Sequence, residues 1–467
     1  MAVKYTRPRG TQDVLPGESW KWEYIEQIIR SQAHSFGYRE IRLPTFESTE
    51  LFARGVGDTT DIVSKEMYTF EDKGGRSITL RPEGTAGVVR AVLENGLLAS
   101  SPLPLKGYYI QSCFRYEKAQ KGRLREFHQF GIECFGTHEP AADAEVIQVA
   151  AQLLQSLGVF KDVTLEINSI GCPKCRPGYN QKLKEYFTAY KQELCPTCQI
   201  RLEKNPMRIL DCKEERCHEI ALGAPVMLEY LCEDCQTHFG EVKTLLEQAG
   251  TAYVINPRIV RGLDYYTNTV FEFIASGVGT QGTVCAGGRY DGLIQELGGQ
   301  PTPAVGFGMG QERLLMALEE KGLLPAPPPG PVLYAVGIGE EGRAAARALV
   351  AELRQSGFEA ECDIANRSVK AQMKAANRLN ALYTMVLGED ESKAGRAKLK
   401  NMDTGAETEV AFTGALETAE GPAEVEFAGG KGPLYNLLLS GYKEAVLRRY
   451  SGLPGATVSF GTTKIEK

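Results

Sequence analysis

The basic loop inside residues 108–135 is the stretch of the sequence best suited to bind an anion. Its cations follow one another with no acid between Glu117 and Glu126, and they are Lys118, Lys121, Arg123 and Arg125. Ammonium and guanidinium groups bind phosphate oxygens, and the planar guanidinium can hold two of them at once. The loop is therefore predicted to bind phosphate groups at the end of the secondary-structure element to which it belongs.

The segments on both sides of this loop alternate as strands do, so the stretch is predicted to form a hairpin. One face gathers the polar side chains Gln111, Arg115, Glu117, Gln129 and Glu133, together with Phe127 and Gly131. The opposite face carries Phe114, Tyr116, Phe130, Ile132 and Cys134. A polar sheet face ordinarily meets water. The alternative is a surface that holds an anionic ligand, and the alternation alone leaves both interpretations open.

A second polar group, Arg81-Pro82-Glu83-Gly84-Thr85, joins a predicted hairpin that turns at residues 73–75 to a predicted helix at 86–96. Thr85 directly precedes this helix, so its hydroxyl can cap the free N–H groups, and it can equally face a ligand. Glu83 stands at a strand end beside a glycine. That is a frequent position for a carboxylate that contacts a ligand.

Three alternate glycines, Gly306, Gly308 and Gly310, precede a predicted helix whose first turn carries Arg313. Their spacing is GxGxG rather than GxGxxG, and no βαβ unit surrounds them, so a dinucleotide-binding site is excluded. The glycines still allow a close approach to the backbone. An anion at Arg313 would also meet the free N–H groups of the helix start.

Eight of the 12 cysteines fall within residues 172–235, in the pairs Cys172/Cys175, Cys195/Cys198, Cys212/Cys217 and Cys232/Cys235. Three pairs have the Cys-x-x-Cys spacing that lets two thiolates bind one ion from a single turn. Free thiols would be expected to scatter along the chain. We therefore expect a structural Zn²⁺ at Cys172, Cys175, Cys195 and Cys198, with the other four cysteines as a second site. A different pairing, or one filled site only, stays open.

The composition is that of an ordinary globular chain, with 43% hydrophobic and 24% charged residues among 467. This length is enough for two or three domains. We find no apolar run that could span a membrane and no apolar signal core, so a cytoplasmic location is expected. The net charge of −6 argues against a broadly basic coat for nucleic acid but permits local basic patches.

The elements that must position these residues lie mainly in residues 1–325. An amphipathic helix is predicted at 17–36 and another helix at about 140–158. Between 172 and 255 the chain is rich in Cys, Lys, Glu and Leu, which predicts an inserted helical subdomain.

The rest of the chain divides into three parts. Residues 326–331 are rich in proline and predict a stiff linker. Residues 332–425 alternate as strand and helix, which predicts a small α/β domain. Residues 426–467 form a basic extension that includes one amphipathic helix, and a flexible connector is predicted at about 414–430.

Three stretches, in order, resemble the signature motifs of class II aminoacyl-tRNA synthetases. EIRLP, ending at Pro44, resembles motif 1, the stretch FRYEKAQKGRLREFHQFGIE resembles motif 2, and GFGMGQERL resembles motif 3. RGLDYYT, from Arg261, and AGGRYDGL, through Tyr290, resemble stretches that set the histidyl-tRNA synthetase family apart. The resemblance covers about residues 4–425, and the α/β domain resembles the anticodon-binding domain found in several such families.

The resemblance implies that ATP, with Mg²⁺, activates histidine as its adenylate and that the histidyl group then passes to the 3′ end of its tRNA. The implied catalytic cations are Arg115, Arg261 and Arg313, and the implied ATP-binding set is Arg115, Glu117, Arg123, Phe127, Arg261 and Arg313. Phe127 would stack on adenine, and Arg261 would lie over the α-phosphate. Fixed cations suit this reaction because charge accumulates on phosphate oxygens.

The resemblance also implies a histidine pocket made of Glu83, Thr85, Gln129, Glu133, Tyr265, Tyr266 and Tyr290. Glu83 and Thr85 would take the α-ammonium, with Gln129 nearby. Glu133 and Tyr266 would meet the two imidazole nitrogens, and Tyr265 and Tyr290 would close the pocket. The loop residues Gln120, Lys121 and Arg123 would lie over the acceptor end of the tRNA.

The implied fold is α+β, an antiparallel sheet flanked by helices with a helical insertion and a C-terminal α/β anticodon-binding domain. A homodimer is implied through motif 1. The eight cysteines depart from the family, so any zinc would hold the insertion together rather than act in catalysis. The rival hypothesis is a non-catalytic, histidine-binding regulatory subunit of ATP phosphoribosyltransferase. Such proteins lack the anticodon-binding domain and carry a degraded RGLDYYT, whereas this chain has both.

Overall fold

The computed structural model describes residues 5–57, 60, 62–275, 282–412, 433–450, 458–460 and 463–465. They divide into two compact units, one on each side of the boundary between Leu323 and Leu324. The boundary follows α11 (Gln311–Glu320) and precedes the prolines of the expected linker. Among the described residues, no helix is both long enough and apolar enough to cross a membrane.

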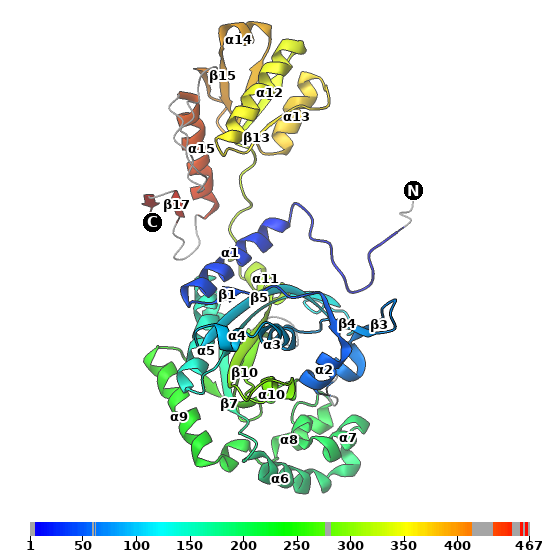
Figure 1. Cartoon of the computed structure of the whole chain (residues 1–467). Coiled ribbons are helices and arrows are strands. Elements are labelled where there is room, and N and C mark those ends of the chain that lie inside the picture. The colour runs from blue at the N-terminus through cyan, green and yellow to red at the C-terminus, as the bar shows by residue number, and fades with distance from the viewer. Residues whose placement is uncertain are drawn as a thin grey trace. The chain divides into compact units, whose positions relative to one another are not determined.

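Eight strands form the sheet that organises the first unit (Figure 1). In their order across the sheet they are β1 (Arg39–Glu40), β5 (Leu105–Phe114), β6 (Glu126–Phe135), β11 (Ala304–Gly310), β10 (Thr283–Arg289), β9 (Thr267–Ala275), β7 (Val163–Ser169) and β8 (Val254–Ile255). Neighbouring strands are antiparallel except at the two edges, where β1 pairs with β5 and β7 with β8 in parallel. The predicted antiparallel sheet is confirmed, with a parallel strand added at each edge.

β5 and β6 form the hairpin predicted around the basic loop, in register from Leu105 opposite Phe135 to Phe114 opposite Glu126. β5 ends at Phe114, but the N–H of Arg115 still donates across the hairpin to the carbonyl of Arg125 at 2.8 Å. The chain turns away at the next residue, because the N–H of Tyr116 donates to the carbonyl of Glu66, outside the hairpin. The prediction that the strand continues to Glu117 is therefore wrong, and Glu117 belongs to the loop.

Both faces of this hairpin are covered by protein. Phe130, Ile132 and Cys134, on the predicted apolar face, are at most 1% exposed. On the predicted polar face, Glu133 is fully buried and Gln111 is 8% exposed. The interpretation in which the polar face simply meets water is therefore wrong for this part of the sheet.

Helices cover the sheet, as predicted. α5 (Pro140–Ser156) packs against β6, β10 and β11, and α1 (Ser19–Ser35) packs against α5. α3 (Thr85–Glu94) contacts β6. The other short helices of this region are α2 (Thr49–Val56), a π-helical turn (Ile62–Glu66), α4 (Leu97–Ser100) and α10 (Leu293–Glu296). A separate antiparallel sheet is made of β2 (Phe46–Ser48), β4 (Ser77–Leu80) and β3 (Tyr68–Glu71).

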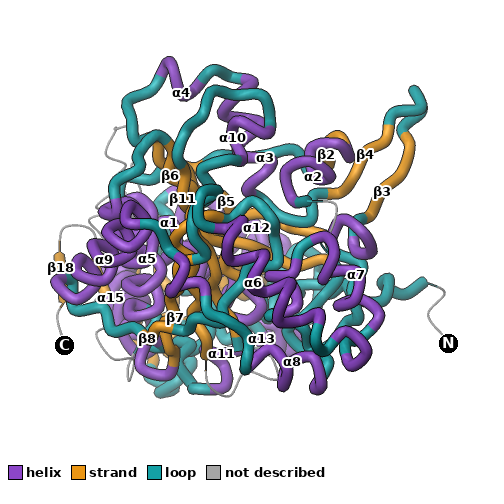
Figure 2. The backbone as a smooth tube through the Cα atoms, turned by 90° about the horizontal axis from the view of Figure 1, so that it is seen from below, coloured by secondary structure: helices purple, strands orange, loops and turns teal. Residues whose placement is uncertain are grey.

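The cysteine-rich segment is helical, as predicted. Its helices are α6 (Arg176–Thr188), α7 (Pro196–Lys204), α8 (Glu215–Leu222) and α9 (Glu233–Gln248). Both views place α6, α7 and α8 beside one another (Figures 1 and 2), and α9 packs against α5. Buried apolar side chains such as Leu183, Phe187 and Leu202 give the segment its core.

The second unit contains a five-stranded sheet in the order β13-β12-β14-β15-β16, whose strands are β12 (Leu333–Gly337), β13 (Ala360–Cys362), β14 (Tyr383–Leu387), β15 (Arg396–Asn401) and β16 (Glu407–Ala411). The first three neighbours are parallel and β15 and β16 are antiparallel. The helices are α12 (Gly339–Gln355), α13 (Val369–Arg378), α14 (Glu389–Ala394) and α15 (Pro433–Arg449), and a hairpin of β17 (Val458–Phe460) and β18 (Thr463–Ile465) follows. The predicted strand–helix alternation is confirmed, and the antiparallel pair was not foreseen.

The helix expected within the extension at residues 426–467 is present as α15, and it packs into the second unit. Leu434, Tyr435 and Leu438 are at most 2% exposed and belong to the apolar core of the second unit. Leucines at positions i and i+4 share one face of a helix, which explains why this face docks. The connector predicted at about 414–430 lies outside the described residues.

Candidate active site

A cavity of about 780 Å³ lies in the first unit against β6, β9, β10 and β11. Eleven of the 13 site residues named from the sequence line it, and these are Glu83, Thr85, Arg115, Glu117, Arg123, Phe127, Gln129, Arg261, Tyr265, Tyr266 and Arg313. The other two, Glu133 and Tyr290, are buried directly behind the lining. Residues separated by as many as 230 positions in the chain thus converge on one space.

Arginines gather at one end of the cavity. Arg115 donates from Nε to the carbonyl of Pro82 at 2.8 Å, and its guanidinium lies 5.2 Å from the ring centre of Phe127. Arg313, in the first turn of α11, donates from Nη1 to the carbonyl of Thr283 at 2.7 Å. Backbone carbonyls thus fix these cations without neutralising them, so the arrangement can attract a polyanion.

Electrostatic crowding is visible at Arg313. Burial, together with the positive charge of Arg123, lowers the pKa of its guanidinium. Arg123 itself pairs with Glu117. Since cations that repel one another gain most from an anion placed among them, this end of the cavity is built for phosphate rather than for an apolar ligand.

Arg261 approaches the same space from the stretch before β9. Its guanidinium pairs with Glu272 and lies 5.7 Å from the ring centre of Tyr266. Burial opposes the charged form, but the carboxylate of Glu272 outweighs it and raises the pKa of Arg261. Its Nε finds no hydrogen-bond partner among the described residues. Arg261 therefore keeps a buried donor for a ligand.

Carboxylates and tyrosines occupy the other end. Glu83, which is 3% exposed, accepts from the backbone N–H groups of Thr85 at 2.7 Å and Ala86 at 2.9 Å. Glu83 therefore caps α3, and the prediction that the Thr85 hydroxyl could do so is wrong. That hydroxyl instead donates to Oε1 of Glu133 at 2.7 Å.

Glu133 is the most deeply buried acid of the site. Its Oε1 accepts from Thr85 and its Oε2 from the hydroxyl of Tyr290. Burial raises the pKa of Glu133 to about 8 and also raises the pKa of Glu83. Two buried acids held only by neutral donors make this end of the cavity favourable for a cation.

The tyrosines form a stack around these acids. The ring centres of Tyr265 and Tyr266 are 4.7 Å apart, and those of Tyr265 and Tyr290 are 5.5 Å apart. The first pair is tilted and the second is edge-on, and such packing holds the rings and their hydroxyl groups in place. A small planar ligand such as an imidazole matches such walls in shape and in hydrogen bonding.

The alternate glycines of β11 make room for side chains of β6. A Cβ at Gly306 would overlap the carboxylate of Glu133, and a Cβ at Gly308 would overlap the amide of Gln129. Strand pairing places Gly306 directly opposite Glu133, whereas Gln129 lies opposite Gly310 and approaches Gly308 diagonally. The close approach to the glycine backbone that the sequence predicts is thus made by side chains of the protein itself, those of Glu133 and Gln129.

Several residues of this cavity were not predicted. Asp211, Lys213 and His218 line it from the insertion, and Glu272 and Glu312 line it from β9 and α11. Glu272 is an acid inside the apolar run of β9, and that contrast could have revealed it. Nothing in the sequence of the insertion indicates that it forms a wall of the cavity. Gln120 and Lys121 of the basic loop are exposed.

The eight cysteines of the insertion form two groups, but not those predicted. Cys172 and Cys175 meet Cys232 and Cys235, while Cys195 and Cys198 meet Cys212 and Cys217. The assignment of Cys195 and Cys198 to the site of Cys172 and Cys175 is therefore wrong. The chain returns on itself, so the outer pairs enclose the inner ones. In each group the four sulfur atoms lie within 4.8 Å of one another.

Comparison with known proteins gives consistent relatives. The chain matches the family model described as histidyl-tRNA synthetase over residues 10–173 and 221–314, and the model described as an anticodon binding domain over residues 332–420. Histidine–tRNA ligases of Acetivibrio thermocellus and Caldanaerobacter subterraneus are each 54% identical to it. The first alignment covers 87% of this chain and 97% of the relative, and the second covers 86% and 96%.

The fold agrees with these matches. The crystal structure of apo S. aureus histidyl-tRNA synthetase superimposes with a TM-score of 0.73 at 39% sequence identity. The alignment covers 87% of this chain and 97% of that one. The family model leaves residues 174–220 unmatched, which is most of the cysteine-rich insertion.

Proposed function

The chain belongs to the histidyl-tRNA synthetase family and is a class II histidine–tRNA ligase, and from this premise we propose that histidine is activated by ATP in the cavity in front of its sheet. The observation that carries the proposal is the opposite character of the two ends of one 780 Å³ space. Arginines collect at one end and buried acids with tyrosines at the other. The reaction joins a polyanion to a zwitterion, and the cavity complements both.

Adenylate formation needs positioning and charge stabilisation more than proton transfer. The carboxylate of histidine attacks the α-phosphorus of ATP, the bond to the pyrophosphate oxygen breaks, and charge accumulates on the phosphate oxygens. Arg261 serves as the donor to the α-phosphate, because its buried Nε has no partner in the described part of the chain and Glu272 fixes its plane. Arg115 and Arg313 hold the α- and γ-phosphates.

The nucleotide and its metal occupy the same end. Phe127 stacks on adenine, below the guanidinium of Arg115. Members of the family use ATP with Mg²⁺, which neutralises the phosphates when it is bound. Glu117 and Glu312 line the cavity and offer carboxylate oxygens, the ligands that Mg²⁺ prefers.

The histidine end selects the amino acid by its hydrogen bonds. Glu83 and Thr85 receive the α-ammonium, with Gln129 beside it. Glu133 and Tyr266 receive the imidazole, while Tyr265 and Tyr290 close the pocket. A site that buries polar partners for each ring nitrogen rejects isosteres steeply, because an unmatched ligand leaves those partners unpaired.

The transfer step requires tRNA, which the anticodon-binding domain at residues 332–420 supports. The exposed loop residues Gln120 and Lys121, with Arg123, contact the acceptor end. The rival hypothesis of a regulatory subunit is excluded, since such a subunit lacks this domain. A deletion of residues 331–467 is expected to spare adenylate formation and to cripple transfer to tRNA. Aminoacylation by the deleted chain at the full rate would refute the role of this domain.

We further propose that the enzyme is a cytoplasmic homodimer. None of the 12 cysteines forms a disulfide, which suits a reducing compartment. The exposed rings of Phe46 and Phe70, on the small sheet beside the motif 1 stretch, offer an apolar contact surface. Sedimentation equilibrium tests the dimer, and a monomer at micromolar concentration would contradict it.

The decisive experiment is histidine-dependent exchange of pyrophosphate into ATP. The purified chain is expected to catalyse exchange with histidine and not with glutamine or phenylalanine, the first lacking a ring and the second lacking ring nitrogens. Exchange without histidine, or none under conditions in which the chain is folded, would overturn the assignment of this cavity.

A further inference from the structure

We propose that the insertion binds two Zn²⁺ ions, one in each four-cysteine group, and that the zinc-bound insertion positions the stretch 261–266 that forms a wall of the cavity. The second part rests on the proposed function of that cavity, whereas the first part does not.

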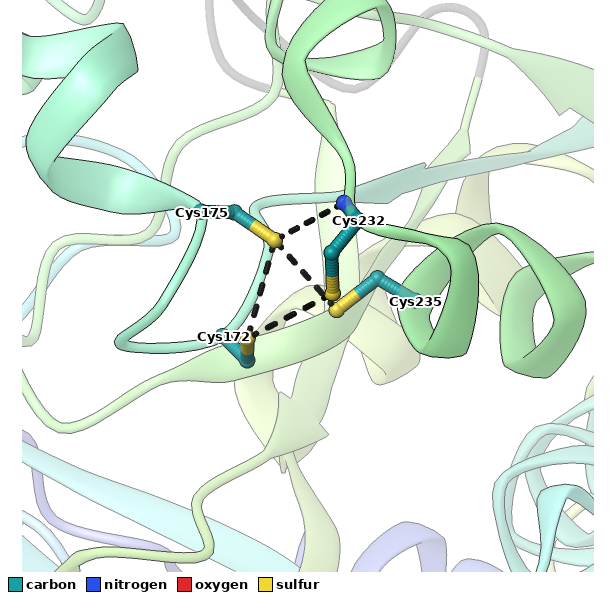
Figure 3. A group of neighbouring side chains, drawn as sticks. All are labelled: Cys172, Cys175, Cys232 and Cys235. Carbon is teal, nitrogen blue, oxygen red and sulfur yellow. Dashed lines mark hydrogen bonds between the residues drawn. The ribbon is translucent and has the colours of Figure 1, made fainter.

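The outer group closes the insertion at its two ends (Figure 3). Cys172 and Cys175 precede α6, and Cys232 and Cys235 begin α9. The sulfur of Cys172 lies 3.6 Å from that of Cys175 and 3.9 Å from that of Cys232, and the sulfur of Cys175 lies 3.6 Å from that of Cys235. Four sulfurs at about 2.3 Å from one tetrahedral ion would be about 3.8 Å apart. The observed separations match a single ion.

The backbone of the outer group also suits thiolates. The N–H of Cys232 donates to the sulfur of Cys175 at 3.1 Å (Figure 3). Donation of this kind stabilises negative charge on sulfur. The four side chains approach from two turns that lie 60 residues apart, so a metal between them would clamp both ends of the insertion.

The inner group repeats this construction. Cys195 caps α7 and Cys198 lies in its first turn, while Cys212 precedes α8 and Cys217 lies in it. The sulfurs of Cys195 and Cys212 are 3.9 Å apart. The N–H of Cys195 donates to the sulfur of Cys217 at 3.2 Å, and that of Cys198 donates to the sulfur of Cys195 at 3.4 Å.

The chemistry of the donors selects the ion. Four thiolates around one point favour Zn²⁺ over hard cations such as Mg²⁺, which prefer oxygen. A cluster of several iron atoms needs more room between its cysteine sulfurs than these separations leave. Both groups lie in a small subdomain, and small cores are commonly stabilised by such ions.

Three side chains connect the cysteine groups to the stretch 261–266. Arg176, which follows Cys175 directly, donates from Nη2 to the carbonyl of Tyr266. Arg208, four residues before Cys212, donates from Nη1 to the carbonyl of Arg261 at 2.8 Å and is 5% exposed. Asn205 donates from Nδ2 to Oδ1 of Asp264 at 3.2 Å.

Two of these bonds end on the backbone carbonyls of Arg261 and Tyr266, which bear the proposed phosphate and imidazole donors. The third ends on the carboxylate of Asp264, between them in the chain. The insertion also supplies Asp211 and Lys213 to the cavity lining, on either side of Cys212. Each hydrogen bond constrains the distance and direction between its two groups. A displacement of the insertion would therefore also displace residues 261–266. Arg176, Asn205 and Arg208 are therefore positioning residues, because they touch the stretch and not the reacting atoms.

The metal part is tested on the full-length chain purified without chelators, by elemental analysis. Two zinc ions per chain are expected. Iron in place of zinc would overturn the metal part of the proposal. Zinc below about half an ion per group, with all eight thiols freely titratable, would also overturn it. Two double variants with equal numbers of lost thiols test the pairing. Cys172→Ser with Cys232→Ser should retain one zinc, whereas Cys172→Ser with Cys195→Ser should impair both sites. The reverse result would overturn the nested arrangement.

A matched control accompanies these variants. Cys362→Ala removes a buried cysteine of the second unit that belongs to neither group. It should keep both zinc ions, and a loss of zinc here would show that general unfolding, rather than loss of a ligand, explains the other variants. In that case the single variants Cys172→Ser and Cys195→Ser are measured below their unfolding temperatures. The zinc content of each folded variant then decides whether the replaced cysteine is a ligand.

The positioning part is tested with Arg208→Met, compared with Arg216→Met on the exposed face of the insertion. Arg208→Met should keep two zinc ions while hydrogen exchange at residues 261–266 rises and kcat of pyrophosphate exchange falls about tenfold. Arg208→Lys, which retains a donor, should recover part of that loss. Arg216→Met should change neither quantity. If hydrogen exchange at residues 261–266 and kcat are both unaltered in Arg208→Met, the positioning role is overturned. Pyrophosphate exchange by the wild-type chain separately tests the proposed function.

Discussion

The two ends of the cavity handle buried charge in opposite ways. At the phosphate end, arginines are held by backbone carbonyls at Pro82 and Thr283, so their positive charge is directed but largely retained. At the histidine end, Glu83 is held by backbone N–H groups and Glu133 by two hydroxyls. Neutral partners therefore hold Arg115 and Arg313 at one end and both acids at the other, with the polarity reversed. Arg123 and Arg261 differ, because each pairs with a carboxylate.

In the ligand-free protein, the buried charge that is costly differs in sign between the two ends, and this difference favours a different ligand group at each. Burial raises the pKa of Glu83 and Glu133, so the acids are costly to ionise until a cation arrives. Burial and a neighbouring cation lower the pKa of Arg313, so its charge is costly until an anion arrives. Each end would thus be stabilised by a ligand group of opposite sign, which is the basis for the proposed placement of histidine and ATP.

Arg261→Ala is expected to have the largest effect, because it removes the donor nearest to the reacting phosphate. Loss of a donor that acts on transition-state charge costs about 3–4 kcal/mol, or roughly a 10²–10³-fold fall in kcat of histidine-dependent pyrophosphate exchange. Histidine binding, measured by calorimetry, should persist. The exposed Arg54, which pairs with Glu50, offers a matched control as Arg54→Ala. Near-normal exchange in Arg261→Ala would remove Arg261 from the phosphate end.

Glu133→Gln tests the opposite end. A hydrogen bond to a charged acceptor is worth about 1.5–3 kcal/mol, so KM for histidine should rise roughly 10- to 100-fold. KM for ATP should stay within about twofold of the wild-type value, since the arginines are untouched. Kinetics at pH 8, where much of the wild-type carboxylate is ionised, give the clearest contrast. A larger change in KM for ATP would place Glu133 at the nucleotide instead.

The raised pKa of Glu133 also predicts how the stability of the ligand-free protein depends on pH. Between the ordinary carboxyl pKa and about 8, the folded state binds a proton that the unfolded state has released. The free energy of unfolding must therefore fall as pH rises through that window. Glu133→Gln lacks this pH-dependent contribution to stability. The melting temperature of the variant minus that of the wild type should therefore increase by roughly 5 °C between pH 5 and pH 8.5. A constant difference would show that Glu133 is already ionised.

Much of this architecture could be predicted from local pattern. The alternation around the basic loop places β5 and β6, and helical spacing places α1, because buried faces impose their period on the sequence. The resemblance of the motifs then brings distant residues such as Arg115 and Arg313 to one site. Eleven predicted residues line the cavity for this reason.

What could not be predicted depends on contacts between segments distant in the chain. The pairing of the cysteines follows from the return of α9 to the start of the insertion, which spacing alone does not reveal. Leu434 and Leu438 look like one face of an isolated tail helix until the core they enter is known. Thr85 has the side chain of a cap, but Glu83 reaches the free N–H groups first and Glu133 takes the hydroxyl.

Phe127→Leu is expected to have the smallest effect, and it separates stacking from support at the phosphate end. The ring lies in the cavity and also under the guanidinium of Arg115, 5.2 Å away. Aromatic stacking contributes about 0.5–1.5 kcal/mol, so loss of the ring should raise KM for ATP roughly 2- to 10-fold with kcat nearly unchanged. Phe127→Tyr keeps the ring and should stay close to wild type. If kcat falls by the same factor as KM rises, the ring acts by holding Arg115 and not by stacking on adenine. KM for histidine should move in neither variant, because the buried acids at the far end make no contact with this ring.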